Sequence, residues 1–386
     1  MAKRRGNGEG TIYRADGRWR AVVSLPTGKR KYLSGRTRDE TGRKLTALLK
    51  NIQDGLPVTA DRETINQFAA GWLAVKKQSI KASTWRRYES LLRVNVLPML
   101  GRVQISKVTP AHLQRLYADR MTAGRGPQTI THIHRVVHAM LSDATRWGNV
   151  ARNVAALVTP PSVPHRDIRA FDADQALRFL GAAMGTKHEA LWTVLISTGV
   201  RIGEVAALRW SDIDLPDRQP TEERDHKVTA SIRVMGTLDR YAGGYSITEP
   251  KSPKSRRRIS LPAAVETTIR QHRSRQDEIR LGRGESLGPN EFVFVNATGG
   301  PLNVTNLARR EFKPLLAKAG LPRSFTIHSL RHTALSFALS RGVAPTDVAE
   351  LAGHSNVAVT LSTYAHALPD APHRATDAIA EVLALG

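Results

Sequence analysis

A proline-rich stretch near the middle of the chain, Val158-Thr-Pro-Pro-Ser-Val-Pro164, constrains the fold more than any other feature. Proline fixes φ and has no backbone N–H, so neither a helix nor a central strand can run through this segment. A second break lies at Asp54-Gly-Leu-Pro57. The sequence therefore predicts three domains, at residues 1–55, 64–158 and 165–386.

The first domain has the pattern of a small sheet with one helix. We expect short strands at 10–14, 18–25 and 29–33, and the Asp16-Gly17 pair between the first two is typical of a tight hairpin turn. Thr37 is a residue type that favours the N-cap of a helix, which we expect to run to about Asn51. The prediction is a three-stranded sheet with a helix across it.

The second domain has the pattern of four helices. The first begins at Thr64, and the second is capped by Ser83 or Thr84 and is expected to stop at Pro98. Thr109-Pro110 begins the third helix in the usual order of cap and proline, and the fourth spans 127–147. The prediction is a compact four-helix domain.

The third domain is predicted to be mainly helical with a small inserted sheet. Strands are expected near 228–235, 256–261 and 291–295. Helices are expected near 172–184, 187–199, 203–210, 262–280, 304–319, 328–341, 345–352 and 370–384. The whole chain is thus predicted to be multidomain and mainly α with small β-sheets.

The charge of the chain indicates a nucleic-acid partner. The formal net charge is +24, and residues 1–160 carry 29 Lys and Arg against 10 Asp and Glu. An excess of this size is typical of proteins that follow a phosphate backbone. The alternative is an ordinary solvated surface. The DNA-binding candidates of the first domain are the basic residues on its strands: Arg14, Arg18, Arg20, Lys29 and Lys31.

Several other classes of protein are excluded by composition. The chain has no cysteine, which removes disulfides, thiolate metal sites and cysteine nucleophiles. No apolar run approaches the length of a membrane span, so we expect a cytoplasmic protein without a membrane partner, associated with the nucleoid when bound to DNA. His134 and His138 have the spacing of two metal ligands, but no glutamate lies between them and no third ligand is evident. We predict no metal site and no cofactor.

Three segments of the third domain carry residues suited to chemistry. Arg201 lies two residues after Gly199, between two apolar helices, and Glu204 lies one turn later. His328, Arg331 and His332 have the i, i+3, i+4 spacing of one helix face, and Gly353-His354 precedes Tyr364 by ten residues. Each segment by itself is also consistent with a surface ion pair, a polar helix stripe or a half-buried aromatic.

Together these segments resemble the tyrosine recombinase, or phage integrase, family. The family has an arginine, a lysine in a β-hairpin, His-x-x-Arg, a histidine or tryptophan, and a tyrosine, in that order. Here the pattern is present as Arg201, a hairpin lysine, His328-x-x-Arg331, His354 and Tyr364. The resemblance covers about 165–386 and implies a mixed α+β catalytic domain. It also implies that 1–55 is an arm-type DNA-binding domain and 64–158 a SAM-like core-binding domain.

The residue types suit phosphodiester transfer without metal or ATP. Tyr364 supplies a phenol that becomes a covalent 3′-phosphotyrosine, and Arg201 and Arg331 can each donate two N–H groups to phosphate oxygens. His354 can donate to the same oxygens, and His328 is the candidate base near the phenol. The supporting residues are Glu204, which is expected to orient Arg201, and His332, which is expected to be structural.

The hairpin lysine has two candidates. The register of related hairpins selects Lys251, and Lys254 is a rival because hairpin lengths vary. The three arginines that follow are expected to contact DNA phosphate: Arg256, Arg257 and Arg258.

The resemblance implies a site-specific recombinase that integrates, and also excises, a phage or another mobile element. Its partners would be double-stranded DNA at core and arm sites, three further copies of the chain in a tetramer, a host DNA-bending factor and an excision factor. The helix at 370–384 would pack on its own domain or on a neighbouring subunit. The alternative is a catalytically silent DNA-binding protein, architectural or regulatory, on the same fold.

Overall fold

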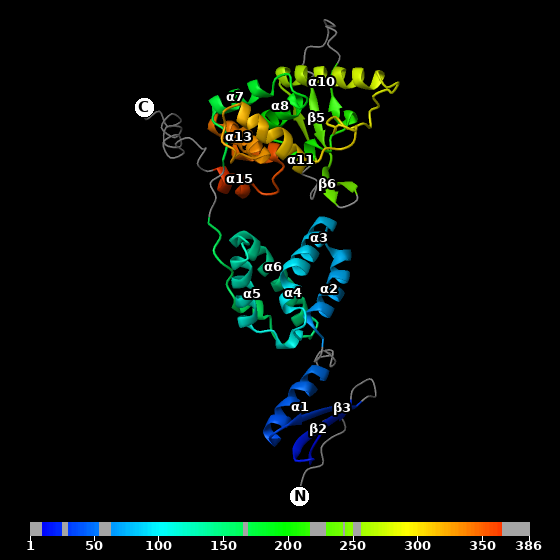
Figure 1. Cartoon of the computed structure of the whole chain (residues 1–386), viewed down its shortest axis with the longest axis vertical. Coiled ribbons are helices and arrows are strands. Elements are labelled where there is room, and N and C mark those ends of the chain that lie inside the picture. Colours follow the sequence, from blue (N-terminus) through cyan, green and yellow to red (C-terminus); the bar gives the residue numbers. More distant parts are fainter. Residues whose placement is uncertain are drawn as a thin grey trace, which may run out of the picture. The chain divides into compact units, whose positions relative to one another are not determined.

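The computed structural model describes residues 10–24, 30–53, 63–164, 169–216, 229–241, 244–249 and 256–364. The chain divides into two compact units, Met1–His165 and Arg166–Gly386 (Figure 1). The predicted class is confirmed, since these residues form mainly helices with small antiparallel sheets. Lys29, Lys251, Lys254 and the helix expected at 370–384 lie outside the described residues.

The N-terminal part contains the predicted sheet and helix. Strands β1 (Thr11–Ala15), β2 (Arg18–Ser24) and β3 (Arg30–Gly35) are antiparallel in that order, and α1 (Arg38–Gln53) packs on one face. Asp16 and Gly17 have φ values of 50° and 73°, as a tight hairpin of this twist requires. Ala21 and Val23 contribute to a small core with Leu45 and Leu48 of α1.

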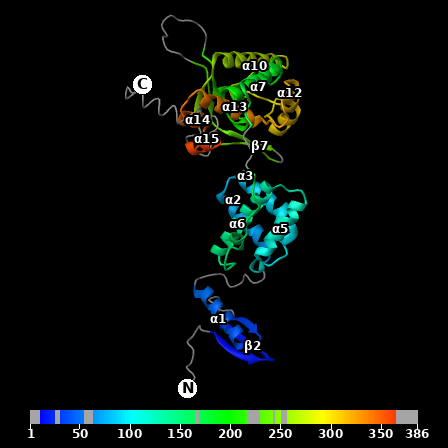
Figure 2. The same ribbon diagram turned by 90° about the vertical axis from the view of Figure 1, so that its left-hand side faces the viewer.

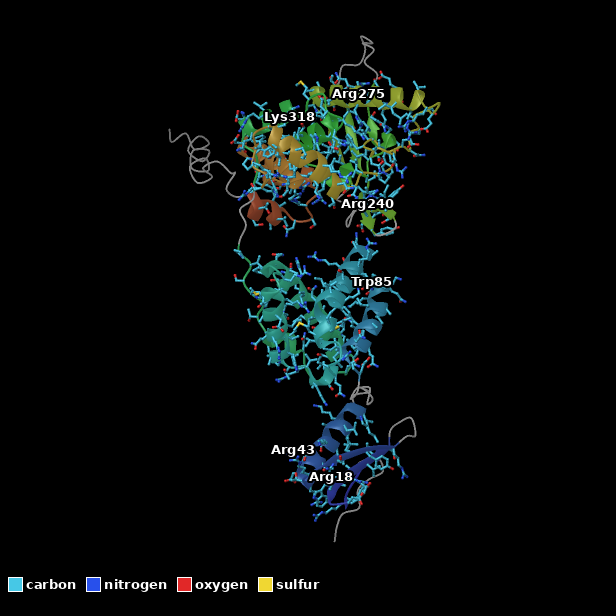
Figure 3. The ribbon with its side chains drawn as sticks, in the orientation of Figure 1. Arg18, Arg43, Trp85, Arg240, Arg275 and Lys318 are labelled. Carbon is cyan, nitrogen blue, oxygen red and sulfur yellow. The ribbon has the colours of Figure 1, made fainter. Side chains whose placement is uncertain are left out.

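The strand register separates the basic side chains onto two faces. Tyr13 pairs with Arg20, and Val22 pairs with Tyr32, on the face opposite α1. The residues that alternation places on this open face include Tyr13, Arg18, Arg20, Arg30 and Tyr32 (Figure 3 labels Arg18). Arg14 pairs with Trp19, and Lys31 pairs with Val23, so both lie on the face toward α1.

The helical part has its own core. It consists of α2 (Ile65–Ser79), α3 (Ala82–Leu91), α4 (Leu97–Leu100), α5 (Pro110–Thr122) and α6 (Pro127–Arg146). Trp72 is fully buried, stacks on Tyr88 and donates its indole N–H to Asp143 at 2.7 Å. The Thr109 hydroxyl accepts from the backbone N–H of His112, which caps α5 as expected.

The expected helix stop at Pro98 is wrong. A π-helical turn, Leu92–Val96, joins α3 to α4, and Pro98 lies in the first turn of α4. The amide of Leu97 donates to the carbonyl of Leu92, five residues earlier. Pro98 has no backbone N–H to donate, and the wider π-helical turn lets the helix continue past it.

The C-terminal unit is built around the apolar helix α8 (Glu189–Thr198). Helices α10 (Ala263–Leu281) and α15 (Val357–Tyr364) lie at opposite ends of the unit in both views (Figures 1 and 2). Its sheet has the order β4 (Ile213–Asp214), β5 (Ser231–Val234), β8 (Arg257–Ser260). Its other helices are α7 (Ala173–Ala183), α9 (Ile202–Val205), α10 (Ala263–Leu281), α11 (Val304–Leu307), α12 (Lys313–Lys318), α13 (Ile327–Ser340), α14 (Pro345–Ala352) and α15 (Val357–Tyr364).

Three expectations for this unit are corrected. The helix expected at 203–210 ends at Val205, and 291–295 forms isolated bridges instead of a strand. A hairpin of β6 (Thr237–Tyr241) and β7 (Gly244–Thr248) was not expected. It packs closely on α9, because a Cβ at Gly203 would lie 2.8 Å from the Thr237 methyl. Within the described residues, the structure contains no helix that is long and apolar enough to span a bilayer.

Candidate active site

Arg201 is placed by the turn between α8 and α9. Gly199 ends α8 with φ of 65°, and a Cβ there would lie 3.1 Å from Leu335. The chain thus reverses so that Arg201 is the N-cap of α9. Its Nη1 donates to Glu204 Oε1 at 2.9 Å, and its backbone N–H donates to Glu204 Oε2 at 3.1 Å. Glu204 therefore contacts both the side chain and the backbone of Arg201.

Arg331 projects from α13 and is almost completely buried, with 2% of its surface exposed. Its Nη1 donates to the carbonyl of Gly199 at 2.6 Å, and its Nη2 donates to the carbonyl of Ala352 at 2.8 Å. Burial, followed by repulsion from Arg201, lowers the pKa of Arg331 to about 10. The guanidinium is still positively charged at neutral pH, so a buried cation faces the site.

His354 follows α14 and contacts Arg331. The Nη2 of Arg331 lies 2.9 Å from His354 Nε2, and His354 Nδ1 lies 2.8 Å from the buried hydroxyl of Thr360. Because a guanidinium only donates, Nε2 accepts here and the ring proton is on Nδ1. Burial, then the charges of Arg331 and Arg201, lower the pKa of His354 to about 4, in agreement with a neutral ring.

Tyr364 ends α15 and is buried, with 1% of its surface exposed. Its hydroxyl lies 2.7 Å from Nδ1 of His332. His328 packs against the ring of His332, and the two ring centroids lie 4.5 Å apart. Burial lowers the pKa of His328. Burial also raises the pKa of Tyr364 to about 12, against the opposing effect of Arg331 and Arg201. The imidazole at the phenol is thus His332, whereas the sequence suggested His328.

Arg257 differs most from its expected position. Its side chain is 5% exposed, and its Nη2 donates to Glu204 Oε2 at 2.8 Å. Its Nε donates to the carbonyl of Leu351 at 2.8 Å. A phosphate contact at the surface was expected, but the guanidinium is buried among protein acceptors. The apolar side chain of Ile259 is the sequence signal that could have predicted this burial. Side chains alternate between the two faces of β8, so Arg257 lies on the same face as Ile259.

The neighbouring arginines border a cleft between β8 and α14. The cleft has a volume of about 970 Å³. Its lining includes Arg256, Arg258, Glu350 and His354. Arg256 pairs with Glu249 at 3.0 Å, and Arg258 pairs with Asp214; both side chains are exposed. Lys251 and Lys254, the two candidates for the hairpin lysine, lie outside the described residues.

The geometry brings together residues that are far apart in the chain. Arg201, His328, Arg331, His354 and Tyr364 all belong to the cluster formed by α9, α13, α14 and α15. A buried phenol beside an imidazole, with two guanidinium groups near enough to act on its pKa, can attack a phosphodiester and compensate its charge.

Known proteins share this pattern. The Phage integrase family matches residues 168–370, and the phage integrase N-terminal SAM-like domain matches residues 64–121. An integrase of Streptomyces ambofaciens is 32% identical over 94% of this chain and 94% of its own length. A XerC-like tyrosine recombinase of Caldanaerobacter subterraneus is 29% identical over 88% of each chain.

The fold has solved counterparts as well. The Tn1549 transposon integrase, solved with a circular intermediate DNA, covers 82% of this chain and 99% of its own with a TM-score of 0.67 and 23% identity. The family match spans more than half of the chain, and the S. ambofaciens integrase matches almost all of it. The chain therefore belongs to the phage integrase family and is a tyrosine-type site-specific recombinase of a mobile element.

Proposed function

We propose that the phenol oxygen of Tyr364 attacks a DNA phosphorus and expels the 5′-oxygen, leaving a 3′-phosphotyrosine. The P–O bond that breaks is replaced by one of similar energy, so rejoining needs no ATP. The phenol proton passes to His332, and the expelled oxygen takes a proton from the hairpin lysine, Lys251 or Lys254. The observation that carries this proposal is the 2.7 Å contact between Tyr364 and His332.

Arg201 and Arg331 would hold the non-bridging oxygens of the phosphate. In the structure, both donate to backbone carbonyls, Arg201 to Gly353 and Arg331 to Ala352. A phosphate oxygen carries more negative charge than a carbonyl and is a stronger acceptor. Its charge would also raise the pKa of His354, so that Nε2 could carry a proton and donate to the phosphate.

The remaining basic surfaces would bind DNA on either side of the cleavage site. We infer that the open face of the N-terminal sheet reads arm sites, because it combines Arg18, Arg20 and Arg30 with Tyr13 and Tyr32. Arg256 and Arg258 would contact phosphate near the cleft. Arg14 and Lys31, on the face toward α1, would contribute less.

The reaction sets the number of subunits. Exchange between two duplexes breaks four strands, and each Tyr364 attacks one phosphodiester, so four copies of the chain would assemble on DNA. A host DNA-bending factor and an excision factor would bring arm and core sites together and set the direction.

Tyr364→Phe tests the proposal. The substitution removes one hydroxyl and no charge, so we expect no covalent adduct and DNA affinity within about twofold of wild type. The probe is a set of nicked duplexes, selected from a randomised library for binding to the full chain and incubated with EDTA. Denaturing gels measure the adduct and gel shifts measure binding.

A covalent band from the Tyr364→Phe protein would mean that another residue is the nucleophile. If the wild-type protein binds these duplexes and yields no adduct, the proposed cleavage by Tyr364 is contradicted.

A further inference from the structure

Three successive carbonyls at the end of α14 each accept a hydrogen bond from a different arginine. Nε of Arg257 donates to Leu351 at 2.8 Å, and Nη2 of Arg331 donates to Ala352 at 2.8 Å. Nη2 of Arg201 donates to Gly353 at 3.3 Å. The last carbonyls of a helix lack intrahelical donors and carry partial negative charge, so cations stabilise them. The corner that leads to His354 and α15 is therefore fixed by three arginines.

Glu204 links two of these arginines. Its Oε1 accepts from Arg201 at 2.9 Å and its Oε2 accepts from Arg257 at 2.8 Å. Arg257 also packs directly on the corner, because a Cβ at Gly353 would lie 2.7 Å from its Nη1. Arg257 thus joins β8, α9 and the end of α14 through one guanidinium.

We propose that Arg257 is a positioning residue of the recombinase site, holding Glu204 and the end of α14 so that Arg201 and His354 meet the phosphate. This inference rests on the proposed function. Its buried guanidinium has acceptors on two sides, Leu351 and Glu204, so it acts through them. An ammonium is a single point of charge and does not reproduce this forked contact.

The loss of Arg257 would change the charge balance around Arg201. The buried carboxylate of Glu204 is now shared between two guanidinium groups, and Arg257 is a larger cause of its lowered pKa than Arg201. Without Arg257, the carboxylate would pair with Arg201 alone and compete with the phosphate for its donors. The expected effect is on the rate of the chemical step at saturating DNA, more than on DNA affinity.

The experiment measures single-turnover cleavage of the selected nicked duplexes over a range of protein concentrations. Arg257→Gln should lower the maximal rate at least about tenfold, with a half-saturating concentration within about threefold of wild type. Arg257→Lys should recover part of the rate, because it restores the charge and one contact.

Arg280→Gln is the matched control. Arg280 donates to Glu291 at 2.8 Å, is 17% exposed, and lies on α10, at the far end of the unit from α15 (Figure 1). The Arg280→Gln variant therefore measures the effect of losing a partly buried arginine–glutamate pair away from the site. We expect it to lower the melting temperature and to leave the maximal rate unchanged.

A double-mutant cycle tests the route through Glu204. In a Glu204→Gln background, Arg257→Gln should reduce the maximal rate by a clearly smaller factor than in the wild-type background, because the shared carboxylate is already absent and only the contact with Leu351 is left to lose. Additive losses would overturn the inference. A wild-type maximal rate for Arg257→Gln would also overturn the inference. So would a loss of rate that is no larger than the fall in the folded fraction of this variant.

The two hypotheses fail in different ways. A wild-type adduct together with an unaffected Arg257→Gln protein overturns only the positioning role. If the wild-type chain forms no adduct, the proposed function fails and the positioning role fails with it.

Discussion

Arg201 divides the donors of its guanidinium between two acceptors. Nη1 donates to Glu204, and Nη2 donates to Gly353, while 37% of the side chain is exposed. Glu204 thus holds Nη1 of the guanidinium, and Nη2 can exchange the carbonyl of Gly353 for a phosphate oxygen. This division of donors is the residue-scale basis of the site, because positive charge alone does not provide it.

Arg201→Lys should therefore lose most of the cleavage rate. We expect a reduction of at least about 100-fold at saturating DNA, comparable to losing one donor to a transition-state oxyanion. Single-turnover cleavage of the selected duplexes measures it, with gel shifts to confirm binding. A rate within a few-fold of wild type would contradict the assigned role.

At the scale of elements, the corner between α14 and α15 places two functional side chains. Gly353 adopts φ of 63°, which ends α14 and directs His354 toward Arg331. From there α15 returns to bring Tyr364 against α13, where it packs with Leu335 and Leu339. The position of Tyr364, the proposed nucleophile, thus depends on a turn eleven residues earlier in the chain.

Gly353→Ala should damage this corner in two ways. A left-handed φ costs a residue with a Cβ about 1 kcal/mol, and the new Cβ would lie 2.7 Å from Arg257. Gly185→Ala is the matched control, since Gly185 has φ of 74° and nothing within 4 Å of the added carbon.

Chemical denaturation should show that both glycine variants lose stability, and only Gly353→Ala should lose cleavage. Equal cleavage by the two variants would mean that the corner tolerates the displacement of Arg257.

At the scale of the whole molecule, separate cores predict separable functions. The N-terminal sheet and α1 form one small core, and the helical part forms another that begins at Ile65. The active-site cluster lies in the C-terminal unit. The parts can therefore be removed or assayed individually.

Deletion of residues 1–55 should spare cleavage of core duplexes and impair integration at full attachment sites. The reason is that the catalytic cluster keeps its packing, while the basic open face is lost. Suicide-substrate cleavage and two-site integration assays measure the two effects. Unimpaired integration by the shortened chain would show that the sheet is not an arm reader.

Stability should fall on acidification. Burial lowers the pKa values of His188 and His354 to about 4, below the unfolded value of about 6.5. Between these values, the unfolded chain binds more protons than the folded chain, so the free energy of unfolding decreases as pH falls.

Thermal melting at about pH 7 and about pH 5 measures this effect, and His188→Gln should reduce the difference. A higher melting temperature at the lower pH would contradict the assignment.

The sequence by itself determined the fold class, most of the elements and the family. Proline and glycine act locally, so the sequence could predict the break at 158–164, next to the boundary between the two units, and the turn at Asp16-Gly17. Helix periodicity is also a local property, so the spacing of His328, Arg331 and His332 placed them on one helix turn. Ordered motifs from three segments then indicated the family.

Tertiary structure alone decided which partners these residues have. Hydrogen-bond partners more than one turn apart depend on packing, so sequence spacing could not tell His332 from His328 at the phenol. Likewise, Arg257 belongs to a basic run typical of a surface, yet it is buried because Glu204 and Leu351 supply acceptors from other elements. The π turn before Pro98 and the β6–β7 hairpin were missed because neighbouring elements, and not local propensity, stabilise them.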